Sequence, residues 1–167
     1  MTATHMVEHS LITGVVAPLL VLASRRLRPS LGPLPGHPLW AWSAFVITQW
    51  VFHLTPLLEA SEGRPLVHAA EHLAFIAVGL WFWLPVLGAA PAGPERRLAE
   101  PGRALYLFLA APAVDLVGVV LMVRGEGGAG VAMLAGTLPV VAAAGIVTWQ
   151  WLTAEQRRAT AMERAHG

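Results

Sequence analysis

A long apolar run extends from Leu66 to Leu87 and begins with the motif His68-Ala-Ala-Glu71-His72. The run is close to the roughly 20 residues that an α-helix needs to cross the core of a bilayer. At 3.6 residues per turn, the two histidines and the glutamate fall within about 100° of one helix face. The sequence therefore predicts a membrane-spanning helix that carries paired imidazoles and a carboxylate at its start.

The composition of the whole chain agrees with a membrane protein. Of the 167 residues, 56% are hydrophobic and 13% are charged, whereas about 25% of the residues of a soluble domain are charged. The formal net charge of +1 indicates no nucleic-acid partner. Cysteine is absent, which excludes disulfides, iron–sulfur clusters and thiolate metal sites. Any metal site must therefore use histidine, methionine or carboxylate ligands.

We predict an all-α, polytopic membrane helix bundle with five transmembrane helices, folded as a single integral membrane domain over residues 1–167. Each span approximates 20 apolar residues, and the segments between spans are short and rich in turn-forming residues. The predicted helices cover about 5–24, 39–58, 66–87, 104–123 and 128–152, and residues 153–167 are predicted to form a polar tail that frays.

The arginines predict the orientation of this bundle. With five spans, Arg64 and Arg124 lie on one side of the membrane and the other nine arginines lie on the opposite side. The positive-inside rule then places the N-terminus outside and the C-terminal tail in the cytoplasm. We expect a multi-pass protein of the bacterial inner (plasma) membrane.

The topology brings most of the histidines to one level. The chain begins with the same pattern as the third span, His5-Met6-Val7-Glu8-His9, and the first and third spans both start on the outer side. The second span runs outward, so that His53 lies near its outer end. Five histidines are therefore expected to converge at this level: His5, His9, His53, His68 and His72.

Such a cluster suits a metal ion. Two histidines at positions i and i+4 can bind one ion from a single helical turn. Imidazole suits copper, zinc, iron and nickel, whereas thioether sulfur selects copper(I). Carboxylates beside ligand histidines either orient them or bind the ion directly. The candidates for these additional roles are Glu8, Glu71, Asp115, Met6, Met122 and Met133.

Asp115 is the least expected of these residues, because apolar neighbours surround it within the fourth span. An ionised carboxylate that faced lipid would cost several kcal/mol. We expect it to face the histidine level, as a metal ligand or as a partner of a ligand histidine. A structural hydrogen bond to a neighbouring helix is the alternative.

Other interpretations remain open for the remaining patterns. Both histidine pairs read H-x-x-E-H, the pattern of inverted zinc proteases, so a zinc or di-metal membrane enzyme is an alternative to a carrier. Two histidines from different helices also suit a bis-histidine haem. Tryptophans near the ends of the spans are typical of an interfacial belt: Trp40, Trp42, Trp81, Trp83, Trp149 and Trp151.

Three segments together resemble one known family. The first is His5-Met-x-x-His9 followed by Ala17-Pro18, and the second is Trp50-Val-Phe-His53-Leu-Thr-Pro56. The third is His68-Ala-Ala-Glu-His72, which leads to Trp81-Phe-Trp83-Leu-Pro85. Over nearly the whole chain, this pattern resembles the membrane cytochrome c oxidase assembly factors of caa-type oxidases, the CtaG-like family.

The resemblance implies a non-enzymatic protein of the bacterial inner membrane that is linked to copper delivery. It implies that the five clustered histidines bind the metal, and that the metal is copper. The expected partners are the lipid bilayer and a cytochrome c oxidase subunit or a periplasmic copper chaperone, and a homo-oligomer is left open. The leading hypothesis is therefore a metallochaperone that holds or delivers copper at the outer face.

Overall fold

The computed structural model describes residues 3–27, 37–57, 63–87 and 98–166, and every regular element in these ranges is a helix. The all-helical prediction is therefore confirmed. In chain order, the elements are α1 (Ala3–Leu11), the π-helix η1 (Ile12–Val16), α2 (Ala17–Leu27), α3 (Pro38–Leu54), α5 (Pro65–Leu87), α6 (Glu100–Val123), α7 (Gly127–Gly136) and α8 (Leu138–His166).

Within the described ranges, four segments are long and apolar enough to cross a membrane. They are Ala3–Ser24, Pro65–Leu87, Glu100–Val123 and Gly127–Ala165. The predicted second span corresponds to α3, whose 17 residues are at the short end of the usual range for a spanning helix. The predicted end of that span, at residue 58, lies outside the described residues. Several membrane-spanning helices are thus supported, and the orientation in the membrane stays a prediction.

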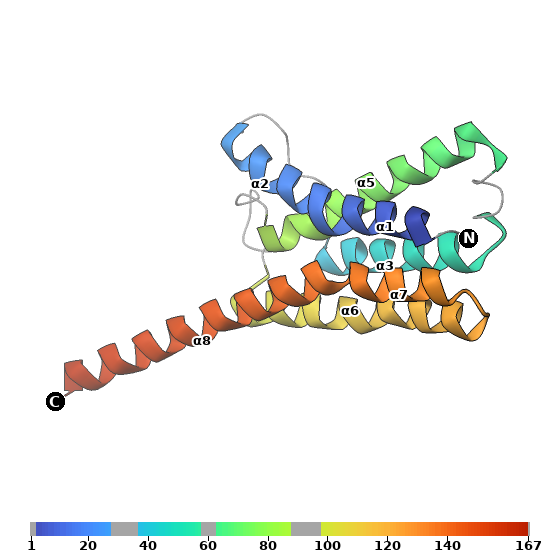
Figure 1. Ribbon diagram of the computed structural model, residues 1–167. Coiled ribbons are helices and arrows are strands. Elements are labelled where there is room, and N and C mark those ends of the chain that lie inside the picture. The colour runs from blue at the N-terminus through green and yellow to red at the C-terminus, as the bar shows by residue number, and fades with distance from the viewer. Residues whose placement is uncertain (1–2, 28–36, 58–62, 88–97, 167) are drawn as a thin grey trace.

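The helices run alternately in opposite directions (Figure 1). The starts of α1, α5 and α7 lie at one end of the bundle, and α3 and α6 finish at this same end. We call this the histidine end, because His5, His9, His53, His68 and His72 all lie there. The predicted convergence of the five histidines depends on this alternation of helix directions.

The last predicted span differs most from the structure. Thr137 interrupts it between α7 and α8, and α8 continues to His166. The prediction that residues 153–167 fray is therefore wrong for the described residues up to 166. Alanine, glutamate, glutamine and arginine dominate this segment, and these residues favour helix even without packing. An ion pair between Arg158 and Glu155 adds to this preference, and the end of α8 extends away from the bundle (Figure 1).

A proline in the first span explains how this span is attached to α5. The Ala17 N–H bonds to the carbonyl of Ile12, five residues back, as in a π-helix. The corresponding donor for the Thr13 carbonyl would be Pro18, which has no N–H. The Thr13 carbonyl instead accepts a hydrogen bond of 2.7 Å from the indole Nε1 of Trp83. Trp83 is fully buried, so its prediction as an interfacial residue was wrong.

Glycines allow α7 to pack tightly against its neighbours. A Cβ atom at Gly136 would collide with the side chain of Ser10 in α1. A Cβ atom at Gly118 would lie 2.9 Å from the carbonyl oxygen of Gly130, where α6 meets α7. Small residues at helix crossings are typical of membrane bundles, because the backbones must approach closely to gain packing energy. The first contact attaches α7 to the helix that carries the first histidine pair, and the second attaches α6 to α7.

Candidate metal centre

The two histidine pairs meet at the histidine end. The rings of His5 and His9 on α1 have centroids 4.3 Å apart, and those of His68 and His72 on α5 are 4.2 Å apart. Between the helices, the His5–His68 and His9–His72 distances are 5.3 Å and 5.1 Å. The expected convergence of the first and third spans is confirmed. Each pair occupies one face because residues four apart lie above each other on a helix.

Glu71 lies at the centre of the cluster and has an exposed fraction of 0%. Its carboxylate oxygens are 3.5 Å from His5 Nε2, 3.8 Å from His9 Nε2 and 4.0 Å from His68 Nδ1. Among the described residues, neither oxygen accepts a hydrogen bond. A buried carboxylate normally has such partners, and an ionised one without them is costly. Glu71 is thus held where a cation between it and the imidazoles would stabilise it.

The distances in the cluster fit a shared ion better than direct hydrogen bonds. Hydrogen bonds between nitrogen and oxygen span about 2.7–3.2 Å, so the contacts to Glu71 are too long. Two tetrahedral ligands that each lie about 2.0–2.1 Å from zinc, for example, are roughly 3.3 Å apart. The gaps of 3.5–4.0 Å around Glu71 are close to that spacing. Small side-chain movements would bring the ligands to bonding distance.

Two groups of ligand atoms are compact enough to hold an ion. One group comprises His5, His9 and Glu71, and all three residues are buried. The other comprises His5, Glu8, His68 and His72, and only His5 is buried. In each group the potential ligand atoms lie within 4.8 Å of one another. We call the first the inner group and the second the outer group; His5 belongs to both.

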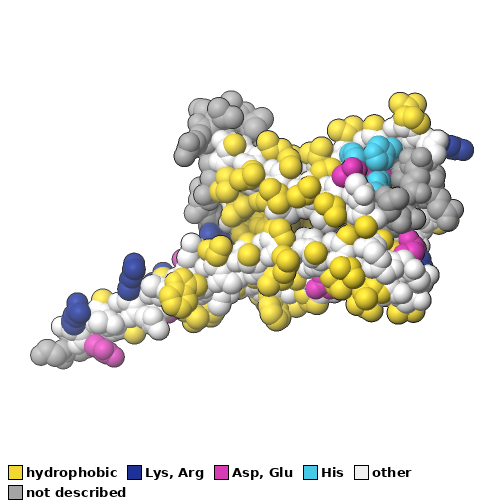
Figure 2. Space-filling model, viewed as in Figure 1, with side chains coloured by type: hydrophobic (Ala, Val, Ile, Leu, Met, Phe, Trp, Pro, Cys, Tyr) yellow, Lys and Arg dark blue, Asp and Glu magenta, His cyan; other side chains and the backbone are white. Residues whose placement is uncertain are grey.

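The outer group reaches the surface. The side chains of Glu8, His68 and His72 are 50%, 38% and 26% exposed, and the Nε2 atom of His72 lies 4.0 Å from a carboxylate oxygen of Glu8. Figure 2 shows histidine side chains gathered with an acidic side chain on the surface at this end of the bundle. The outer group therefore lies at the surface of the protein, whereas the inner group lies beneath it.

A chain of hydrogen bonds orients His9. The Nδ1 atom of His53 is 2.6 Å from the carbonyl oxygen of Gln49, so it must donate its hydrogen there, because a carbonyl only accepts. Neutral His53 then accepts at Nε2 from His9 Nδ1, at 3.3 Å. Because neutral His9 carries its hydrogen on Nδ1, its Nε2 atom has a free lone pair, and this atom faces Glu71. Both ring nitrogens of His53 thus have hydrogen-bond partners, and His53 orients the ring of His9.

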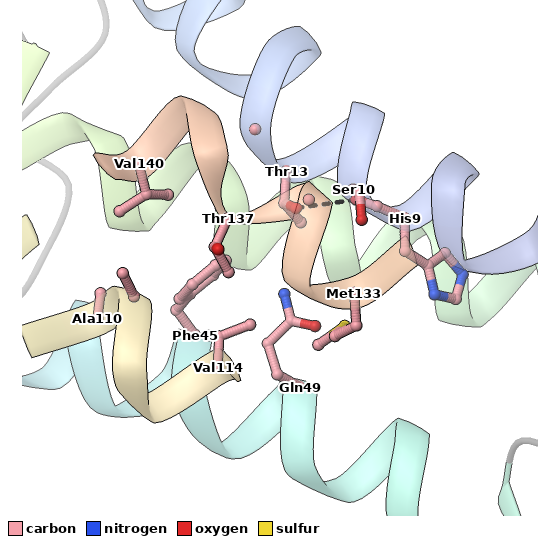
Figure 3. A pocket seen from close by; sticks show the side chains of 13 residues that line it. His9, Ser10, Thr13, Phe45, Gln49, Ala110, Val114, Met133, Thr137 and Val140 are labelled. Carbon is pink, nitrogen blue, oxygen red and sulfur yellow. Dashed lines mark hydrogen bonds between the residues drawn. The ribbon is translucent and has the colours of Figure 1, made fainter. Parts of the chain in front are cut away.

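Apolar and weakly polar surroundings close the inner group from below. Phe75 stacks on His9 with ring centroids 4.2 Å apart. Beyond His9 lies a cavity of about 20 Å³, which is enough for one water molecule. Figure 3 shows that Gln49 and Thr137 extend towards this cavity, while the ring of His9 is turned away from it. The surroundings on the inner side of this group therefore have a low dielectric constant, which strengthens the attraction between Glu71 and a cation.

The remaining sequence candidates lie elsewhere or have other contacts. The Thr137 hydroxyl donates to a carboxylate oxygen of Asp115 at 2.8 Å, which is the alternative that the sequence left open. Met6 is fully buried in the core and Met122 is 44% exposed. Met133 lines the cavity beside His9. Among the described histidines and carboxylates, Asp115 joins neither ligand group.

The sequence did not identify the residues that support the cluster. Gln49 precedes His53 by one helical turn, which is the only signal that could have linked them. The role of Thr13 depends on a carbonyl freed by Pro18, and its donor, Trp83, comes from another helix. Contacts of this kind arise from how helices cross, so no local pattern announces them.

Comparisons with known proteins show what the chain is similar to. Residues 1–127 match the family described as cytochrome c oxidase caa3 assembly factor (Caa3_CtaG). An uncharacterized protein of Mycobacterium bovis and one of Mycobacterium tuberculosis are each 29% identical over 147 residues, which covers 73% of this chain. The chain spans only 22% of the length of these relatives. No solved structure matches the chain.

The matched region contains every residue of the two ligand groups. It extends from the start of the chain through α6, and so includes all three segments that carry the resemblance. The match covers well over half of the chain, and it confirms the family suggested by the histidine motifs. The chain belongs to the family of cytochrome c oxidase caa3 assembly factors.

Proposed function

We propose that this protein binds copper at the outer face of the bacterial inner membrane and holds or delivers it for cytochrome c oxidase assembly. The observation that carries the proposal is Glu71, which is fully buried and faced by imidazole nitrogens of His5, His9 and His68 at 3.5–4.0 Å. A buried carboxylate without a hydrogen-bond donor, with imidazole nitrogens beside it, favours a bound cation.

Copper is supported by the donor set together with the family. Imidazole nitrogen and carboxylate oxygen suit copper(II), and they also suit zinc. Oxidase assembly makes copper the more fitting cargo, as the resemblance of the three histidine segments implies. The imidazole rings pack within 4.2–6.1 Å of one another, and this packing favours a bare ion over a haem between two of these histidines.

A carrier role is favoured over an enzyme. The family is one of assembly factors, which supports a non-enzymatic function. The two H-x-x-E-H motifs face each other across α1 and α5 and combine into one cluster, whereas a zinc protease of this pattern would use one motif with a distant ligand. The proposed partners are a cytochrome c oxidase subunit, or a copper chaperone that meets the exposed outer group.

Equilibrium titration of the purified protein with copper tests the proposal. We expect one tightly bound ion per chain in the parent protein. The double variant His5→Ala/His9→Ala should lose it, because both ligand groups lose residues. His166→Ala, which removes a histidine at the far end of α8, serves as the control and should bind as the parent does. Equal copper stoichiometry in all three proteins would contradict the proposal.

Two further measurements identify the metal and the side of the membrane. Elemental analysis of protein purified without added metal should find copper rather than zinc. A reporter fused after Gly167 should be active only in a cytoplasmic format, because nine arginines are predicted on that side. Activity in the outer compartment would place the histidine end in the cytoplasm and remove the proposed site of delivery.

A further inference from the structure

We infer that a single ion occupies two positions in turn, an outer loading position and an inner holding position, and that His5 is a ligand in both. This inference rests on the proposed metal binding and says how the ion enters and leaves. It starts from the fact that the two ligand groups are distinct yet share His5. The groups also differ in burial, since all three residues of the inner group are buried and only His5 of the outer group is.

Burial changes steadily from one position to the other. Glu8 and His68 are the most exposed ligands, at 50% and 38%, while His9 and Glu71 are 2% and 0% exposed. His5, at 8%, lies at the boundary. An ion from solution therefore meets the outer group first. Among the described residues, the ligands of the inner group are all buried, so the ion reaches them through the outer group.

The charges favour one ion at a time. Glu8 and Glu71 are the only carboxylates of the two groups, so they supply at most two negative charges, fewer than two divalent ions carry. Because His5 belongs to both groups, two ions would also lie close together, where the surroundings screen their repulsion poorly. One divalent ion is balanced when it lies between the two carboxylates.

A shared ligand allows the ion to move without being released. Bound at the outer position, the ion contacts His5 together with Glu8 and the α5 pair. It then exchanges Glu8, His68 and His72 for His9 and Glu71 while His5 stays attached. The inner position holds the ion more firmly, because His9 is already oriented by His53 at 3.3 Å and Glu71 is fully buried. Delivery to a partner is the same exchange in reverse.

Rapid mixing with buffered Cu²⁺ separates loading from holding. In the outer variant Glu8→Gln/His72→Ala, we expect the parent stoichiometry and nearly the parent affinity. Its rates of loading and of release to EDTA should both fall by about tenfold, at the lower end of what changes around a metal ligand cause. In the inner variant Glu71→Gln, copper should still bind, but release to EDTA should be at least about tenfold faster. His166→Ala should match the parent in every measurement.

Freeze-quench electron paramagnetic resonance gives a second readout that does not depend on rates alone. The parent protein should show an early Cu²⁺ spectrum that matches the spectrum of Glu71→Gln and then converts to a different final spectrum. If Glu71→Gln does not fold as a monodisperse protein, His9→Ala replaces it, since it also removes an inner ligand.

Different failures point to different conclusions. One bound ion with a single spectrum at all times, and an outer variant that loses affinity at an unchanged loading rate, would overturn the two positions and leave the proposed function intact. Two ions bound simultaneously per parent chain would also overturn the exchange. A parent protein that binds no copper at all would overturn both this inference and the proposed function.

Discussion

Glu71 and Asp115 are both carboxylates within predicted membrane spans, and their surroundings differ sharply. Asp115 is partly buried and accepts a hydrogen bond of 2.8 Å from Thr137, at the break between α7 and α8. Glu71 is fully buried and accepts no hydrogen bond from the described residues, although three histidines face it. Asp115 thus has a hydroxyl donor of the protein as a partner, whereas Glu71 has imidazole nitrogens around it at distances that leave room for a cation.

The comparison also separates the two halves of the bundle. Around Asp115, α6 and α7 approach closely through Gly118 and Gly130 and bury mainly small and apolar side chains. Around Glu71, the crossing of α1 and α5 is filled by polar rings. A polar cluster at this depth is expensive, so the crossing of α1 and α5 gives up packing stability for binding, whereas the contact of α6 with α7 is a close packing of small residues.

The largest effect is expected from Glu71→Gln. The substitution keeps the size of the side chain and removes the charge that faces His5 and His9. Copper affinity should fall by more than about 100-fold, beyond the 10–100-fold typical of residues that only support a ligand. Competition titration against a copper chelator measures it. An unchanged affinity would reduce Glu71 to a structural residue and remove the contrast with Asp115.

His53→Ala should have an intermediate effect. His53 holds His9 through a contact of 3.3 Å and is itself held by the Gln49 carbonyl. Loss of this orientation should weaken copper binding by about 10–100-fold while the stoichiometry stays the same. The same chelator competition measures it. A loss as large as that of Glu71→Gln would instead make His53 a ligand, as the sequence pattern suggested.

Thr137→Val should lower stability and spare copper binding. It removes the hydroxyl that donates to Asp115 and leaves that carboxylate without this partner, at a cost of about 1–3 kcal/mol. Unfolding in detergent, followed by circular dichroism, measures the change. Thr137→Ser keeps the hydroxyl and serves as the matched control, so equal destabilisation by both substitutions would show that the hydrogen bond is not the cause.

Asp115→Asn should have the smallest effect. Its amide oxygen can still accept from Thr137, and the residue shares no ligand group with the histidines. Copper affinity should stay within about twofold of the parent, since substitutions without shared partners interact by only about 0.3–0.5 kcal/mol. A tenfold weaker affinity in the chelator competition would return Asp115 to the metal centre and break the comparison.

The sequence by itself determined the level of each residue along its helix. The length of the apolar runs and the alternating direction of the spans were enough to bring His5, His9, His68 and His72 to one end, because rise per residue converts position in the chain directly into depth. The i, i+4 spacing also placed each pair on one face. These features depend on helix geometry alone.

Tertiary structure decided what each residue faces at that level. Asp115 and Glu71 both lie at depths compatible with the metal centre. The rotation and crossing of the helices turn Asp115 towards Thr137 and Glu71 into the imidazole cluster. The same crossings buried Trp83 against the Thr13 carbonyl and gave His53 its contact with His9. Such contacts depend on distances of a few ångströms between helices, which are set by packing of side chains from distant parts of the chain and not by the period of any one helix.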